Sequence, residues 1–287
     1  MKLESANRQQ AKIKMGIQGV SGGGKTLGAL LIAFGIIQDW NKIAVIDSEN
    51  KSAHLYAHLG PYKVLNLEPP FTPERYIQAI EVCEKGLIEV IILDSISHEW
   101  EGRGGILDIH SNMAGNSFTN WAKLTPRHNF FVEKMLQCNA HIIATIRSKQ
   151  DYVLNEKNGK QIPEKVGLKG VTREGMDYEF TLVLEVDIKH NAIATKDRTG
   201  IFVGKPEFRI TMETGTTISS WCNEGSSVEQ VKRQIETCKD IAELKKLYTS
   251  FPQYQSELKA FFMAKKAEFE KQDLLNENYN QNGTTGS

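Results

Sequence analysis

The chain has 287 residues, and its 35 lysines and arginines balance its 35 aspartates and glutamates, so the formal net charge is zero. This balance argues against a protein that acts through bulk charge, such as a histone-like or polyacidic protein. A hydrophobic content of 40% and a charged content of 24% are ordinary for a globular protein. The length allows one large domain with a small appendage.

No apolar run reaches the roughly 18–20 residues that span a bilayer, and the polar start MKLESANRQQ lacks the apolar segment of a signal peptide. The four cysteines are far apart and form no CxxC pair. We therefore expect a cytoplasmic protein with reduced thiols and no membrane partner. The cysteines are Cys83, Cys138, Cys222 and Cys238.

The first half of the chain alternates strand and helix patterns. Apolar alternation or continuous β-branched runs predict strands at 11–19, 42–47, 88–94 and 141–147. Helical patterns run from a glycine-rich turn to about Gln38, from Pro73 to Gly86, and over 120–137, whereas Gly, Ser and Asn at 101–118 indicate a loop. This order predicts an α/β fold with a mostly parallel sheet and helices on both faces.

The second half changes character. Residues 151–168 predict a hairpin with Asn158-Gly159 at its turn, 178–188 and 191–197 an antiparallel pair, and 200–204 a short strand. Apolar residues then follow helical spacing. The predicted organisation is a flexible arm at 1–10, an ATPase core at 11–225 with an antiparallel extension at 151–205, a helical module at 226–273 and a disordered tail at 274–287.

The segment GVSGGGKT matches the phosphate-loop pattern G-x-x-x-x-G-K-[ST] in full, follows a predicted strand and opens a predicted helix. Glycines let backbone N–H groups converge on phosphate oxygens, and the helix N-terminus adds partial positive charge. Lys25 should reach the β- and γ-phosphates of ATP, and Thr26 should bind Mg²⁺. The predicted nucleotide-binding residues are Gly19, Val20, Ser21, Gly22, Gly23, Gly24, Lys25 and Thr26.

Two carboxylates complete this predicted site. Asp94 ends the apolar run VIILD, where it can hold Mg²⁺ through water or, alternatively, cap a helix. Ser95 follows it, whereas AAA+ proteins and many helicases place a glutamate there, so those families fit the sequence poorly. The segment IDSEN at 46–50 resembles the RecA/RadA/DnaB class, in which the catalytic glutamate follows the strand after the phosphate-loop helix. The resemblance implies that Glu49 polarises the attacking water; the alternative is a solvated loop residue.

Two further motifs resemble this class. IATIRSK at 143–149 resembles the RecA strand that ends in a γ-phosphate sensor, usually Gln, and Thr145 holds the matching position. KDRTG at 196–200 resembles the KNRFG motif of RadA and the K-x-R-x-G of DnaB-type helicases, whose Lys and Arg reach the γ-phosphate of a neighbouring subunit. The resemblance implies such a role for Lys196 and Arg198, which would share one side of a strand, in a homo-oligomeric ring or filament. The alternative is a basic strand end on a solvated face.

Over residues 11–205, and most specifically over 143–200, the chain resembles phage-encoded RecA-core P-loop ATPases related to single-strand-annealing recombinases, often described as AAA-family proteins. The resemblance implies ATP-linked binding of single-stranded DNA, with strand annealing or exchange, in the host-cell cytoplasm.

The hairpin region carries charge that fits such a partner. Residues 147–173 hold seven basic and three acidic residues, and Tyr152 could stack on a base. The alternative is a hairpin with lysine-guarded edges. In the loop at 102–118, Arg103, His110 and Phe118 are further possible contacts. The predicted DNA-binding residues are Arg147, Lys149, Tyr152, Lys157, Lys160, Lys165 and Lys169.

Two other functions fit the same motifs. The chain could be an ATP-switched loader or adaptor whose C-terminal helices dock a phage replication or single-strand-binding protein. It could also be a DnaB-like helicase motor, which ranks lower because 287 residues leave no separate N-terminal collar domain.

Overall fold

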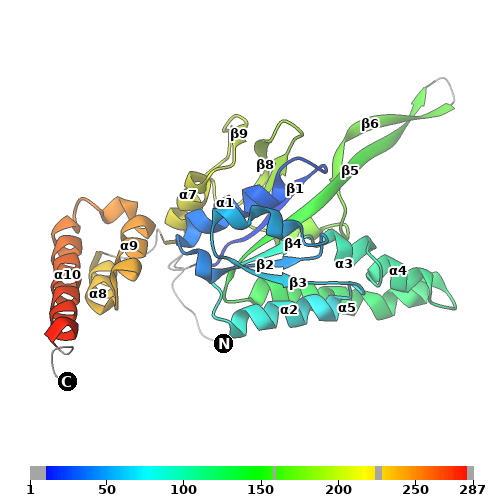
Figure 1. Cartoon of the computed structure of the whole chain (residues 1–287). Helices are drawn as coiled ribbons and strands as arrows, with labels where there is room; N and C mark the ends of the chain where they lie inside the picture. Colours follow the sequence, from blue (N-terminus) through cyan, green and yellow to red (C-terminus); the bar gives the residue numbers. More distant parts are fainter. Residues whose placement is uncertain (1–10, 158–159, 224–227, 283–287) are drawn as a thin grey trace, which may run out of the picture. The chain divides into compact units, whose positions relative to one another are not determined.

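The computed structural model describes residues 11–157, 160–223 and 228–282, with the backbone alone at 150–157, 160–168 and 273–282 (Figure 1). The chain divides into two compact units. Residues 12–217 form the larger unit, and the smaller one contains the C-terminal helices. Each unit has a hydrophobic core of its own.

Within the described residues, the larger unit is built on a nine-stranded sheet of order β3-β2-β4-β5-β1-β7-β8-β9, with β6 paired to β5. The six strands from β3 to β7 in this order are parallel, whereas β6, β8 and β9 pair antiparallel. The α/β class with a mostly parallel sheet is therefore confirmed. The bounds are β1 Lys14–Gly19, β2 Ile43–Asp47, β3 Lys63–Asn66, β4 Val90–Asp94, β5 His141–Lys157, β6 Lys160–Gly170, β7 Leu182–Val186, β8 Asn191–Asp197 and β9 Phe208–Arg209.

Helices connect the parallel strands, and their ends follow capping chemistry. Thr72 accepts a hydrogen bond from the Arg75 amide at the start of α2, and Gly86 follows its last residue. The bounds are α1 Lys25–Ile37, α2 Pro73–Lys85, α3 Ser97–Glu101, α4 Ile106–Ser111, α5 Ser117–Gln137, α6 Met176–Glu179 and α7 Met212–Asn223, with 3-10 segments η1 Trp40–Lys42 and η2 Ser52–Leu59.

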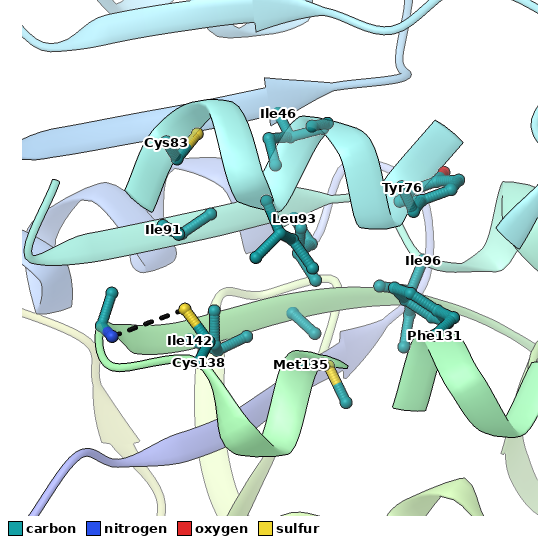
Figure 2. Packing of buried hydrophobic residues seen from close by; sticks show 14 of the residues in the cluster. Ile46, Tyr76, Cys83, Ile91, Leu93, Ile96, Phe131, Met135, Cys138 and Ile142 are labelled. Atoms are coloured by element: carbon teal, nitrogen blue, oxygen red, sulfur yellow. Dashed lines mark hydrogen bonds between the residues drawn. The ribbon is translucent and has the colours of Figure 1, made fainter. Parts of the chain in front are cut away.

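The core on one face of the sheet lies beneath α2 and α5 (Figure 2). Ile46, Ile91 and Ile142 from neighbouring strands pack there with Tyr76 of α2 and Phe131 of α5. Alternate strand residues point to the opposite face, where α1 packs against β1, β4 and β5. All four cysteines are buried and form no disulfide in the structure. Burial raises the pKa of Cys83 to about 12, so this thiol stays protonated.

Two local predictions, a loop at 101–118 and a strand at 200–204, were wrong. Residues 101–118 are not one loop, because Asp108 accepts a hydrogen bond from the Gly104 amide at the start of α4, and Asn116 caps α5. Residues 200–204 form no strand. The Asp197 carboxylate accepts hydrogen bonds from three amides of the following residues and folds them into a turn; the donors are Thr199, Gly200 and Phe202.

The predicted hairpin is confirmed in the backbone. Strands β5 and β6 pair from Ser148↔Gly170 to Lys157↔Lys160, and the predicted turn Asn158-Gly159 lies outside the described residues. β5 is continuous from the core into the hairpin, so the hairpin extends a central strand of the sheet (Figure 1).

The smaller unit contains α8 Val228–Thr237, α9 Ile241–Ser250, η3 Pro252–Tyr254 and α10 Lys259–Asn282. Val231, Leu244 and Phe262, one from each α-helix, pack together in its core. The apolar residues of each helix lie on one face because they follow helical spacing. We predicted a disordered tail from residue 274, but α10 continues to Asn282. Glu, Gln and Leu in this segment favour helix. None of the helices in the described parts of the chain combines the length and apolarity needed to cross a bilayer.

Candidate functional site

The strand order sets the carboxyl ends of β2, β4, β5 and β1 in a row. Asp47 is paired with Asp94, and Gly19 with Arg147. Because these strands are parallel, the residues that follow them meet at one edge of the sheet. A cavity of about 750 Å³ lies at this edge. Its wall includes residues 21–28 together with Glu49, Asp94 and Arg147.

The phosphate loop has a backbone that only glycine adopts readily. Gly22 and Gly24 have φ angles of +80° and +88°. A Cβ atom on Gly19 would lie 2.4 Å from the Val186 carbonyl oxygen, so this position also requires glycine. No side chain caps the N-terminus of α1, which begins at Lys25 within the cavity wall. The first-turn amides are therefore available for an anion.

Lys25 stands inside this loop. Its ammonium donates to the carbonyl oxygens of Gly19 (3.0 Å) and Val20 (2.9 Å). Burial lowers its pKa, while the nearby carboxylates of Asp94 and Glu49 raise it. Of the eight predicted nucleotide-binding residues, Ser21 to Thr26 line the cavity. Gly19 and Val20 instead act through the carbonyl groups that hold the lysine.

Asp94 receives two threonine hydroxyls. Thr26 Oγ1 donates to Asp94 Oδ2 at 2.7 Å, and Thr145 Oγ1 donates to Asp94 Oδ1. Burial raises the pKa of Asp94, and both hydrogen bonds lower it. Thr26 and Asp94 supply hard oxygen atoms, the donors that Mg²⁺ prefers, so the predicted metal-binding pair is brought together. Thr145 is fully buried against Asp94 and does not belong to the cavity wall.

Glu49 follows β2 directly. The Asp47 carboxylate accepts a hydrogen bond from the Glu49 amide at 2.7 Å, which fixes the chain at this point. The Glu49 carboxylate receives Arg147 on both oxygens, with Nε donating to Oε1 at 2.8 Å and Nη2 to Oε2. Burial raises the pKa of Glu49, but Arg147 lowers it, with smaller contributions from His98 and Ser95, so that the pKa lies below its ordinary value. A carboxylate therefore lies beside the phosphate loop, as predicted.

Lys196 and Arg198 lie at the opposite edge of the sheet. β8 is antiparallel to β7, and Lys196 pairs with Val183 near the start of β7. The Lys196 ammonium donates to the carbonyl oxygens of Asp177 (2.9 Å) and Tyr178 (2.6 Å). The exposed Arg198 follows the end of β8, so the two side chains do not share one side of a strand as predicted. Neither belongs to the wall of the chain's own cavity.

The predicted DNA-binding residues separate into three groups. Arg147 belongs to the cavity wall. Lys149 and Lys169 are exposed and directly paired across β5 and β6. The side chains of Tyr152, Lys157, Lys160 and Lys165 lie outside the described residues. Of the contacts expected at 102–118, Phe118 is exposed, whereas the His110 ring stacks on Trp121.

Several cavity residues escaped the sequence analysis. His190 lies in the turn between β7 and β8, and Arg209 and Ile210 lie at and just after β9. The turn could have been found, because β7 is parallel to β1 and a turn after it must lie at the phosphate-loop edge. No signal marked Arg209. The other residues missed are Leu27, Gly28, Leu31, Ser52, Tyr56, Ser148 and Val186.

The mostly parallel sheet, the glycine loop at a helix N-terminus and the Lys25–Thr26–Asp94 group define a P-loop nucleotide-binding domain. A family model described as "AAA domain" matches residues 11–209. The match covers more than half of the chain, which therefore belongs to the AAA domain family and carries a P-loop ATPase domain. The chain matches none of the curated proteins.

Proposed function

We propose that the protein is a Mg-ATP-hydrolysing RecA-type ATPase that acts on single-stranded DNA, as a homo-oligomer, in phage-type recombination or annealing. The observation that carries the ATPase assignment is the 2.7 Å contact between Thr26 and Asp94 at the phosphate loop, with Glu49 at the next strand end. This arrangement supplies the three groups that phosphoryl transfer requires: a phosphate cradle, a metal-binding pair and a base.

Each group has a distinct task. The first-turn amides of α1 and the Lys25 ammonium bind phosphate oxygens, with Lys25 exchanging its carbonyl partners for them. Thr26 and Asp94 would hold Mg²⁺, which neutralises charge that develops on the phosphates. Glu49 accepts a proton from water as the water oxygen bonds to the γ-phosphorus. The bond from that phosphorus to the β–γ bridging oxygen breaks, which yields ADP and inorganic phosphate.

Four further residues of the cavity wall suit the nucleoside. Leu31 of α1 and Ile210 after β9 supply apolar surface, and the exposed His190 and Arg209 supply flat cationic or aromatic groups. Ile210 approaches α1 closely, since a Cβ atom on Gly28 would lie 3.1 Å from its Cδ1 atom. His190 also lies beside the phosphate loop, since a Cβ atom on Gly24 would lie 3.2 Å from its Nδ1 atom.

The hairpin supports the DNA assignment. Lys149 and Lys169 stand directly opposite each other on exposed positions, an arrangement that is unfavourable between like charges unless a polyanion lies over them. The same strand β5 carries Arg147 in the cavity wall and Lys149 two residues further on. Strand β5 would therefore connect a nucleic acid bound on the hairpin directly to the nucleotide site.

The position of Arg198 supports the oligomer. Its exposure at the edge away from its own cavity fits a residue that completes the site of a neighbouring subunit. Turnover would then depend on assembly.

The ATPase assignment is tested with Glu49→Gln, with the exposed Glu68→Gln as the matched control. We expect Glu49→Gln to bind a fluorescent ATP analogue while its steady-state turnover falls by about 100-fold or more, because the amide cannot accept the proton. Glu68→Gln should behave as the parent. Parental turnover in Glu49→Gln would show that the base is elsewhere.

The DNA assignment is tested by fluorescence anisotropy of a labelled single-stranded oligonucleotide. Charge reversal at Lys149 and Lys169 together should weaken binding by about tenfold at low salt, and reversal of Lys42, the last residue of η1, and Lys63, the first residue of β3, should not. Equal binding by both variants would contradict the hairpin site. In that case the loader remains, and deletion of 226–287 should remove its protein partner.

A further inference from the structure

We propose that Arg147 is the γ-phosphate sensor of this site: its guanidinium leaves Glu49 for the terminal phosphate when a triphosphate binds, and so releases the base. This inference rests on the proposed ATPase function. It differs from the sequence prediction in two residues, since Thr145 was expected to be the sensor and Arg147 a DNA contact.

Thr145 is unsuited to the role. Its hydroxyl is buried and donates to Asp94 Oδ1, and the residue does not belong to the cavity wall. A hydroxyl that orients the metal-binding carboxylate would have to abandon it to reach a phosphate. Arg147 lies two residues further along β5, belongs to the wall, and has a side chain that is 44% exposed.

The backbone of Arg147 is fixed while its side chain is free to change partner. Its amide donates to Ser97 Oγ at 2.9 Å, its carbonyl oxygen accepts from the Val171 amide at 2.7 Å, and it pairs with Gly19 of β1. Gly19 begins the phosphate loop, so the guanidinium extends from a point directly beside that loop. Its positive charge contributes to the lowered pKa of Lys25, which places the two cations in one electrostatic environment.

The present partner of Arg147 is incompatible with catalysis. Both Glu49 oxygens accept from the guanidinium, and this pairing holds the Glu49 pKa down, which makes it a weaker base. Two oxygens of a terminal phosphate can accept from the planar guanidinium in bidentate fashion, as the two oxygens of a carboxylate do. Exchange of one anion for the other would bind the γ-phosphate and free Glu49 in a single movement.

The exchange predicts selective recognition of triphosphates. Equilibrium binding of ADP and of an ATP analogue with a non-hydrolysable β–γ bridge should be measured with Mg²⁺ for the parent, Arg147→Ala, Arg147→Lys and the control Lys63→Ala, an exposed lysine at the start of β3. We expect Arg147→Ala to weaken analogue binding by about tenfold and ADP binding by less than twofold, because ADP lacks the contacted group. Arg147→Lys should fall between, since ammonium cannot make the bidentate contact.

Glu49→Gln gives a second, opposite readout that does not depend on losing the arginine. Without the carboxylate, Arg147 has no ion pair to break, so the analogue should bind several-fold more tightly than to the parent. This gain should vanish in Glu49→Gln combined with Arg147→Ala. A structural role for Arg147 would not produce a gain that depends on it.

Equal weakening of ADP and analogue by Arg147→Ala, or no weakening of either, would overturn the sensor. A gain in Glu49→Gln that persists without Arg147 would do the same. These results differ from failure of the ATPase proposal itself, in which the parent would bind neither nucleotide and Lys25→Ala would change nothing.

Discussion

Two lysines near opposite ends of β1 show how one type of side chain takes different roles at the two ends of a strand. Lys14 opens β1, and Lys25 follows the phosphate loop beyond its other end. Each ammonium donates to two backbone carbonyl oxygens. Lys14 is enclosed, with 6% of its surface exposed, and holds the carbonyl groups of Cys138 and Ala140, which follow the last turn of α5.

The difference lies in what else surrounds the ammonium. Lys25 belongs to the wall of an open cavity and has Asp94 and Glu49 nearby, so an incoming anion can replace its carbonyl partners. Lys14 has no place in that wall, and burial lowers its pKa to about 8. A lysine at the carboxyl end of parallel strands is thus available for chemistry, whereas one at the amino end stabilises a helix end.

The largest expected effect separates these two lysines. Lys25→Ala should lower ATP turnover by about 1000-fold, because the β- and γ-phosphates lose their cation in the transition state. Lys14→Met should keep turnover within about twofold of the parent at a temperature where it is folded. Steady-state phosphate release measures both. Comparable losses in the two variants would erase the distinction.

A second effect concerns the edge that holds Arg198. Arg198→Ala should lower turnover by about 100-fold, since a trans-acting arginine neutralises transition-state charge. Mixing Lys25→Ala with Arg198→Ala should restore part of the activity, because a mixed interface contains one intact site. If the two variants co-assemble by analytical ultracentrifugation and no activity returns, Arg198 does not act in trans.

The enclosed Lys14 predicts a pH dependence of stability. Its pKa of about 8 lies below the ordinary value of 10.5, so from pH 8 to 10.5 the unfolded chain binds more protons than the folded one, and stability rises with pH. Between pH 8 and 10 this gain is about 2 kcal/mol. Urea unfolding should show that Lys14→Met gains less than the parent by this amount. Identical pH slopes would mean that Lys14 is solvated.

A smaller effect is expected at Thr145. Thr145→Val removes the hydroxyl that orients Asp94 while keeping the shape of the side chain, so the Mg²⁺ concentration for half-maximal turnover should rise by about threefold to tenfold. Thr195→Val, an exposed threonine on β8, is the control. If Thr145→Val leaves the Mg²⁺ dependence unchanged and instead abolishes the preference for triphosphates, Thr145 and not Arg147 is the sensor.

Local patterns predicted the parts of the fold that depend on local chemistry. The apolar runs of β2 and β4, the phosphate loop and the capped helix α2 are each determined by neighbouring residues in the sequence. The order of the parallel strands is not, and it alone brings Glu49 next to Arg147. The hydrogen-bond partner of Thr145 could not be predicted either, because the sequence does not indicate which carboxylate a buried threonine will contact.

Hydrogen bonds to side chains explain the remaining differences. Asp197 was interpreted only as part of a basic motif, yet its carboxylate ends β8 and places Arg198 in a turn. Arg209 and Ile210 lie at the cavity because β9 pairs antiparallel with β8. A strand of only two residues gives too short a sequence pattern to predict this pairing.

We expect ATP turnover at this cavity to respond to single-stranded DNA bound on the hairpin that continues from β5. ATP turnover with and without a single-stranded oligonucleotide, measured over a series of salt concentrations, tests it most directly. DNA should raise turnover at low salt, and the stimulation should decline as salt rises, because basic side chains bind the phosphate backbone. Turnover that is unchanged by DNA at the lowest salt would contradict it.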